Sequence, residues 1–173
     1  MRHFARLLLS AVVLASAAHL PARADLAQYL AKPEPAFSWK KTDEKTLTGG
    51  KVYDLHLVSQ EWQGIRWEHR LQLFVPDKCE NPSLCTLMNT GGSGSPEDAI
   101  IGLLGARASG SPFAVVYNVP NQPLFGGKSE DALIVHTWLR YLETGDESWP
   151  LHFPMTKAVI KAMDALQAFA KSE

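Results

Sequence analysis

Cysteine is scarce in this chain, and so is any arrangement of metal ligands. The 173 residues include two cysteines, Cys79 and Cys85, and no second cysteine pair or histidine pair stands at the spacing of a zinc site. We therefore expect no metal and no cofactor. The five residues between the cysteines contain Asn81 and Pro82, which favour a turn. In an oxidising compartment such a pair can close a small loop, so we predict a Cys79–Cys85 disulfide, with two unpaired thiols as the alternative.

Long apolar runs are also missing. The apolar stretch near the N-terminus covers residues 7–18, whereas about 20 apolar residues are needed to span a bilayer. Basic side chains precede this stretch, and small residues at signal-peptidase spacing follow it. This order predicts a signal peptide over 1–24, with a cut near 15–17 as the alternative. Cleavage would place the mature protein, beginning at Asp25, in the periplasm or outside the cell without a stable membrane anchor.

Excess positive charge is absent as well. The chain has 17 lysines and arginines against 18 aspartates and glutamates, and three of the arginines lie within residues 1–24. Removal of the signal peptide therefore gives a net charge near −4. That balance argues against nucleic acid or an anionic membrane as the main partner. The mature length suffices for one domain with a hydrophobic core and is too short for two.

The mature chain divides into a polar lead-in and a region of regular structure. Residues 25–50 contain prolines and a run of charged side chains, and predict an extended lead-in with one short helix near 26–30. Apolar and polar residues then alternate over 53–57 and again over 67–75, as expected for half-buried strands. Because Gln63-Gly64 can form a turn between them, we predict an antiparallel hairpin.

Strand–helix units are predicted in the remainder of the chain. Residues 86–88 and 114–117 are apolar at consecutive positions, which is typical of strands buried on both faces of a parallel sheet. Ser95-Pro96 and Ser129 are start signals for a helix after each strand. The order of elements over 51–173 therefore predicts an α/β fold.

A third helix is predicted over 154–170, after a turn at Gly145. Its spacing places Val159, Met163, Leu166 and Phe169 on one apolar stripe.

A glycine-rich loop follows the strand at 86–88. Gly91, Gly92 and Ser93 lie between that strand and a helix start, where bare backbone N–H groups can stabilise a developing negative charge. We therefore name these residues as candidates for an oxyanion loop, and a turn that packs strand against helix is the structural alternative. The segment Gly91–Ser95 also resembles a nucleophile elbow but ends in serine instead of glycine. Ser93 is accordingly a weaker candidate for a nucleophile.

Two further patterns give weaker indications of function. The segment Phe125–Ser129 has the setting of a phosphate-binding loop, but Gln122 stands where its first glycine should be, and two nearby prolines remove N–H donors. We interpret it as a structured loop before a helix. The histidines that follow the signal peptide are expected to be structural or unassigned: His56, His69, His136 and His152.

Several strings in the second half of the chain carry a resemblance to a known family. They are Asn118-Val119-Pro120-Asn121-Gln122-Pro123-Leu124, Glu130–Ile134, Thr144-Gly145-Asp146, Trp149-Pro150-Leu151 and Pro154–Val159. They closely resemble the PhoPQ-activated pathogenicity-related protein family, over roughly residues 53–170. The family is similar to α/β-hydrolases, has members several hundred residues long, and includes a secreted eukaryotic branch that acts as an autocrine proliferation repressor.

The resemblance implies a function for the longer parent. It implies an incomplete α/β-hydrolase-like sheet in which residues 90–93 are the oxyanion loop and the strand carrying the serine elbow would begin just past residue 170. No catalytic triad residue can be carried over to this sequence. We therefore expect a truncated, exported family member that is inactive alone, whose parent acts on a peptide or ester substrate. A genuinely short protein is the alternative to truncation, and a non-catalytic secreted binding or signalling protein is the alternative function.

Overall fold

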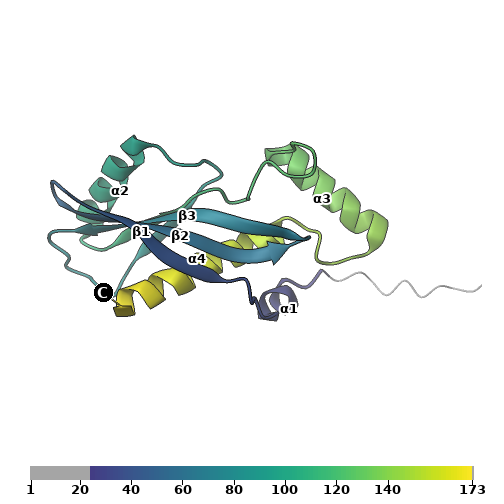
Figure 1. Ribbon diagram of the computed structural model, residues 1–173, viewed down its shortest axis with the longest axis horizontal. Helices are drawn as coiled ribbons and strands as arrows, with labels where there is room; N and C mark the ends of the chain where they lie inside the picture. The colour runs from purple at the N-terminus through teal and green to yellow at the C-terminus, as the bar shows by residue number, and fades with distance from the viewer. Residues whose placement is uncertain (1–23, 173) are drawn as a thin grey trace, which may run out of the picture.

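The computed structural model describes residues 24–172, so all but the last residue of the predicted signal peptide lies outside the described part of the chain. A single five-stranded sheet runs through the molecule in the order β1-β2-β3-β5-β4 (Figure 1). β1, β2, β3 and β5 are joined by antiparallel pairings, and β4 pairs with β5 in parallel. The elements are α1 (Leu26–Ala31), β1 (Ser38–Leu47), β2 (Gly50–Trp62), β3 (Ile65–Pro76), β4 (Thr86–Asn89), α2 (Pro96–Ser109), β5 (Phe113–Val116), α3 (Glu130–Thr144) and α4 (His152–Ser172).

The predicted hairpin is confirmed as β2 and β3. Gln63 and Gly64 form its turn with φ of 51° and 71°, which matches the turn that suits the right-handed twist of two paired strands. A register shift between Val58 and Gln60 interrupts the pairing and adds local twist. The hairpin therefore follows from local sequence, whereas its bulge does not.

The extended lead-in predicted for residues 25–50 is wrong over its second half. Residues 38–47 form β1, a ten-residue strand paired with β2. Almost every side chain of β1 is exposed, so the strand lacks the alternation that marks one buried face. Its lysines, acidic residues and bulge between Lys41 and Asp43 are features that protect the free edge of a sheet.

The two strands predicted to be buried on both faces behave differently. β5 is confirmed as a central strand, and three of its four residues are buried. The prediction is wrong for β4, whose side chains are largely exposed because it lies at the sheet edge. Strand order, which sequence does not show, decides this difference.

The helices cover opposite faces of the sheet. α4 packs along one face, and α2 lies over the other (Figure 1). The predicted stripe of α4 is only partly correct, because Met163 is 48 % exposed. Small residues take its place against the sheet: Ala158, Ala162 and Ala165 are fully buried. Their size lets the helix axis approach the strands closely.

A buried polar cluster attaches the N-terminal segment to α4. Lys157 Nζ lies 3.0 Å from a carboxylate oxygen of Glu34, and both side chains are nearly inaccessible to water. Beside this ion pair, the Tyr29 hydroxyl donates to Gln60 Oε1 at 3.0 Å, and Gln60 donates to the Pro154 carbonyl. These contacts join α1, β2 and α4, which are far apart in the chain.

The cysteines are not bridged in the structure, in contrast to the predicted disulfide. Cys79 is a half-buried free thiol, and Cys85 is an exposed one. Cys85 Sγ instead faces the carbonyl oxygen of Thr86 at 3.8 Å, so its side chain is directed along the start of β4. No helix within residues 24–172 has the length and apolar content needed to cross a membrane.

Candidate functional site

The candidate site lies at the carboxyl ends of the parallel strands β4 and β5. Two backbone hydrogen bonds extend the β4–β5 pairing past the ends of both strands: Thr90 N donates to the Val116 carbonyl and Val119 N donates to the Thr90 carbonyl, each at 3.0 Å. The glycine loop at 90–95 and the proline-rich loop at 118–129 therefore begin side by side. In open α/β sheets, ligands bind outside the carboxyl ends of parallel strands.

Some backbone groups of the glycine loop are hydrogen-bonded within the protein, and others are free. The Gly92 carbonyl accepts a hydrogen bond from Asn118 N at 2.9 Å, and Gly92 N donates to Thr90 Oγ1 at 3.2 Å. Among residues 24–172, no hydrogen bond engages the N–H groups of Ser93 and Gly94. Two successive free donors in a bent loop are suited to hold a negatively charged oxygen.

The Tyr117 ring packs against Gly94 of this loop. A side chain added at Gly94 would place its Cβ only 2.8 Å from Tyr117 Cε1, and Gly94 has a φ of 85°. The Tyr117 hydroxyl donates to Gln72 Oε1 at 2.8 Å, and the Arg70 guanidinium lies 5.5 Å from the ring centre. Burial and the nearby Asp98 carboxylate raise the pKa of Tyr117 to about 12, so it remains a neutral phenol at physiological pH.

Replacing Gly94 by alanine is expected to displace the loop. The new methyl group would clash with the fixed Tyr117 ring, and the left-handed backbone would add strain, for a combined cost of about 1–3 kcal/mol. Urea denaturation measures this loss. Gly126→Ala is the matched control, since Gly126 also has a positive φ of 81° but has open space around it. Equal losses in the two variants would contradict close packing on Tyr117.

Helix α2 begins directly after the glycine loop. Ser95 N donates to Asp98 Oδ2 at 2.9 Å, and Pro96 occupies the first turn, which confirms the predicted helix start. The positive end of the helix dipole therefore lies next to the free N–H groups of the loop. Both contributions favour negative charge at the same place.

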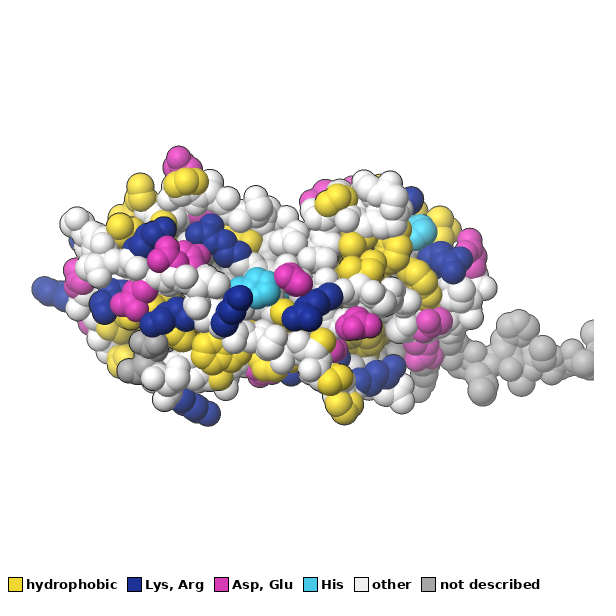
Figure 2. Space-filling model, viewed as in Figure 1, with side chains coloured by type: hydrophobic (Ala, Val, Ile, Leu, Met, Phe, Trp, Pro, Cys, Tyr) yellow, Lys and Arg dark blue, Asp and Glu magenta, His cyan; other side chains and the backbone are white. Residues whose placement is uncertain are grey.

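A polar groove extends from the loop across β1, β2 and β3. Near Gly94 and Ser95 it has a volume of about 340 Å³, and an adjoining hollow of about 530 Å³ shares Lys45, Asp54 and Arg70 with it. Arg70 Nε donates to Asp54 Oδ1 at 2.6 Å, and Asp54 is largely shielded from water. Figure 2 shows basic and acidic side chains interspersed over these strands, which suits a polar ligand and not a strongly charged one.

His69 supports the site from inside the sheet and was not recognised from the sequence. It is 2 % exposed, and its Nδ1 lies 3.1 Å and 3.0 Å from the carbonyl oxygens of Tyr117 and Asn118. Nδ1 therefore carries the proton, and Nε2 accepts from the Ser59 hydroxyl at 2.9 Å. Burial lowers the pKa of His69 to about 4. The neutral ring thus fixes the end of β5 and is not available as a base.

The other histidines do not converge on Ser93. His56 lies on the sheet surface, where its Nε2 is 2.8 Å from Glu68 Oε2. His136 lies on α3, and its ring centroid is 5.1 Å from that of Phe125. His152 is exposed at the start of α4. Within the described residues, no histidine is hydrogen-bonded to Ser93, so the structure assembles no serine–histidine pair around it.

The segment at 125–129 does not form a phosphate cradle. Leu124 and Lys128 are paired as an isolated antiparallel bridge, which folds the glycines between them into a tight turn. Lys128 Nζ donates to the Phe125 carbonyl at 2.9 Å and is directed back into its own loop. No group of three or more potential ligand side chains within residues 24–172 is arranged to hold a metal ion.

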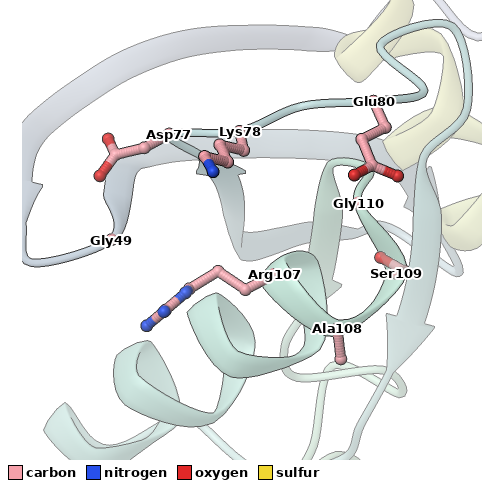
Figure 3. A pocket seen from close by; sticks show the side chains of 8 residues that line it. All are labelled: Gly49, Asp77, Lys78, Glu80, Arg107, Ala108, Ser109 and Gly110. Atoms are coloured by element: carbon pink, nitrogen blue, oxygen red, sulfur yellow. The ribbon is translucent and has the colours of Figure 1, made fainter.

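A second polar hollow lies at the opposite end of the parallel strands. It is about 490 Å³ in volume and is formed by the β1–β2 turn, the segment after β3 and the end of α2 (Figure 3). Its charged side chains are Asp77, Lys78, Glu80 and Arg107, and all four are exposed. Two positive and two negative charges balance, so this hollow shows no preference for one sign of charge.

The mixed five-stranded sheet with helices on both faces gives this chain an α/β-hydrolase-like fold. It superposes with a TM-score of 0.53 on a structure described as that of an acetyl xylan esterase from Bacteroides fragilis, with 14% identity over 83% of this chain and 40% of that one. A glucuronoyl esterase from Solibacter usitatus has a TM-score of 0.49, 13% identity, and coverage of 83% and 46%.

The chain belongs to the PhoPQ-activated pathogenicity-related protein family, whose profile matches residues 26–173. It is also 29% identical, over 167 residues, to the Autocrine proliferation repressor protein A of Dictyostelium discoideum. That match covers 85% of this chain and 33% of the relative. The chain therefore spans about a third of the length of this relative, and under half of the two esterase structures.

Proposed function

We propose that the glycine loop is the oxyanion-binding part of an acyl-transfer site, and that this chain alone does not complete that site. The free N–H groups of Ser93 and Gly94, beside the N-terminus of α2, carry the proposal. The longer relatives would act on ester or peptide bonds of a polar substrate that lies in the groove beside Arg70. Acyl transfer also needs an activated nucleophile and a base, and the described residues do not bring such a pair to the loop.

Hydrolysis of p-nitrophenyl acetate by the purified chain tests this proposal. We expect a rate orders of magnitude below that of a working hydrolase, because loss of nucleophile and base leaves only the small contribution of the oxyanion site. Ser93→Ala should leave this residual rate unchanged, since the loop acts through its backbone. Robust turnover that Ser93→Ala abolishes would show that Ser93 is a nucleophile and would contradict the proposal.

Export to the periplasm or beyond the cell belongs to the same proposal. The basic, apolar and small residues of 1–24 support it. Mass analysis of the protein recovered outside the cytoplasm should give an N-terminus at or near Asp25. Recovery of an intact Met1 from the exported fraction would argue against cleavage.

A non-catalytic secreted role is the second candidate, favoured by the similarity to the Dictyostelium protein named as an autocrine proliferation repressor. On this hypothesis the polar groove binds a partner without chemistry. A longer relative that is exported, folded and inactive on both ester and peptide substrates would favour it.

A further inference from the structure

An apolar pocket lies on the α4 face of the sheet, at the opposite end of β4 and β5 from the glycine loop. Its volume is about 380 Å³, and its floor is formed by Leu73, Leu166 and Phe169. Its outer wall is the segment at 79–85, which includes Leu84. None of the residues that line it carries a charge. The volume falls within the range of small-molecule sites.

Backbone hydrogen bonds hold this wall in place. Glu80 N and Asn81 N both donate to the Gly110 carbonyl, at 2.7 Å and 2.9 Å, and Thr86 N donates to the Pro112 carbonyl at 3.1 Å. The segment is thus fixed to the end of α2 and the start of β5. The pocket between this wall and α4 is therefore already open in the structure without a ligand.

The side chains in the pocket favour an aromatic ligand. The Tyr53 and Phe169 rings meet edge to face, with centroids 5.1 Å apart. Cys79 and Cys85 add two polarisable sulfur atoms at the wall, and sulfur packs favourably against aromatic rings. Although Cys85 as a whole residue is exposed, partial burial of its thiol at the pocket wall raises the pKa of this thiol to about 11, so it is neutral at physiological pH.

We propose that this pocket binds an uncharged aromatic molecule of one or two rings. An anionic analogue is excluded because no cation among the lining residues would compensate for the loss of its hydration. The site is independent of the glycine loop, so the outcome of its test has no bearing on the proposed acyl-transfer chemistry. Its two thiols also provide a local reporter of occupancy.

The test uses 2-naphthol as the probe and the full chain under reducing conditions. We expect binding with a dissociation constant below about 1 mM, as suits a small ligand with few atoms. At a concentration of about ten times this constant, alkylation of Cys79 and Cys85, followed by mass spectrometry, should slow by about tenfold. The anion 2-naphthoate should neither bind nor protect.

Two variants locate the site. Leu84→Asp places a charge on the wall and should weaken 2-naphthol binding at least tenfold. The same change at Leu104 on α2, which is also exposed, is the control and should leave binding unchanged. Ala170→Trp should fill the pocket from α4 and abolish both binding and protection. Circular dichroism checks that each variant is folded.

Several results would overturn the proposal. They are absence of 2-naphthol binding, binding without protection of the thiols, equal binding of 2-naphthoate, and full binding by folded Leu84→Asp or Ala170→Trp.

Discussion

Replacing Lys157 by methionine is expected to destabilise the protein by about 3–5 kcal/mol, which is a large part of the stability of a domain this size. The Lys157 and Glu34 side chains are 5% and 9% exposed, so the substitution leaves a carboxylate buried without its partner. It also removes a hydrogen bond from Lys157 Nζ to the Lys32 carbonyl and a cation–π contact with Tyr29. Urea denaturation at neutral pH measures the loss.

A matched substitution on the same helix separates this effect from a general cost of removing lysine. Lys161 pairs with Asp164 at 2.8 Å, but Asp164 is 43% exposed, so Lys161→Met should cost no more than about 1 kcal/mol. Adding Glu34→Gln to Lys157→Met should recover part of the loss, because the unpaired charge is removed. Similar unfolding midpoints for the two lysine variants would contradict the importance of the buried pair.

Lowering the pH from 7.5 to 5 is expected to remove about 2 kcal/mol of stability through His69 alone. The pKa of His69 is about 4 in the folded protein, chiefly because the ring is buried, against an ordinary value of 6.5. Between pH 6.5 and pH 4, His69 is protonated in the unfolded chain but stays neutral in the folded protein. Acid therefore favours unfolding in this window, and the His69 contribution levels off below pH 4.

His69→Gln tests this assignment. We expect the variant to be less stable than the wild type at pH 7.5, since the hydrogen bonds to the Tyr117 and Asn118 carbonyls are altered. Its free energy of unfolding should, however, no longer show the fall of about 2 kcal/mol between pH 7.5 and 5 that His69 causes. His56→Gln is the control, because His56 lies on the surface beside Glu68 and should leave the decrease in place. Chemical denaturation at several pH values measures both. An unchanged pH dependence in His69→Gln would rule out His69 as its source.

Local sequence determined several elements of this fold. Gln63-Gly64 predicted the hairpin of β2 and β3, and Ser95-Pro96 predicted the start of α2, because a turn and a helix cap each depend on a few adjacent residues. The continuous apolar run of β5 likewise indicated a central strand. The position of the glycine loop between β4 and α2 follows from the same short-range signals.

Tertiary structure alone decided which strands are edges and which polar side chains are buried together. β1 was missed because an exposed strand has no apolar alternation, and β4 was expected to be buried because sequence does not show strand order. His69 is fixed to the end of β5 through the Tyr117 carbonyl, 48 positions away, and Lys157 donates to the Lys32 carbonyl, 125 positions away. Such pairings arise from strand register and helix packing, which place distant residues in contact only after the chain has folded.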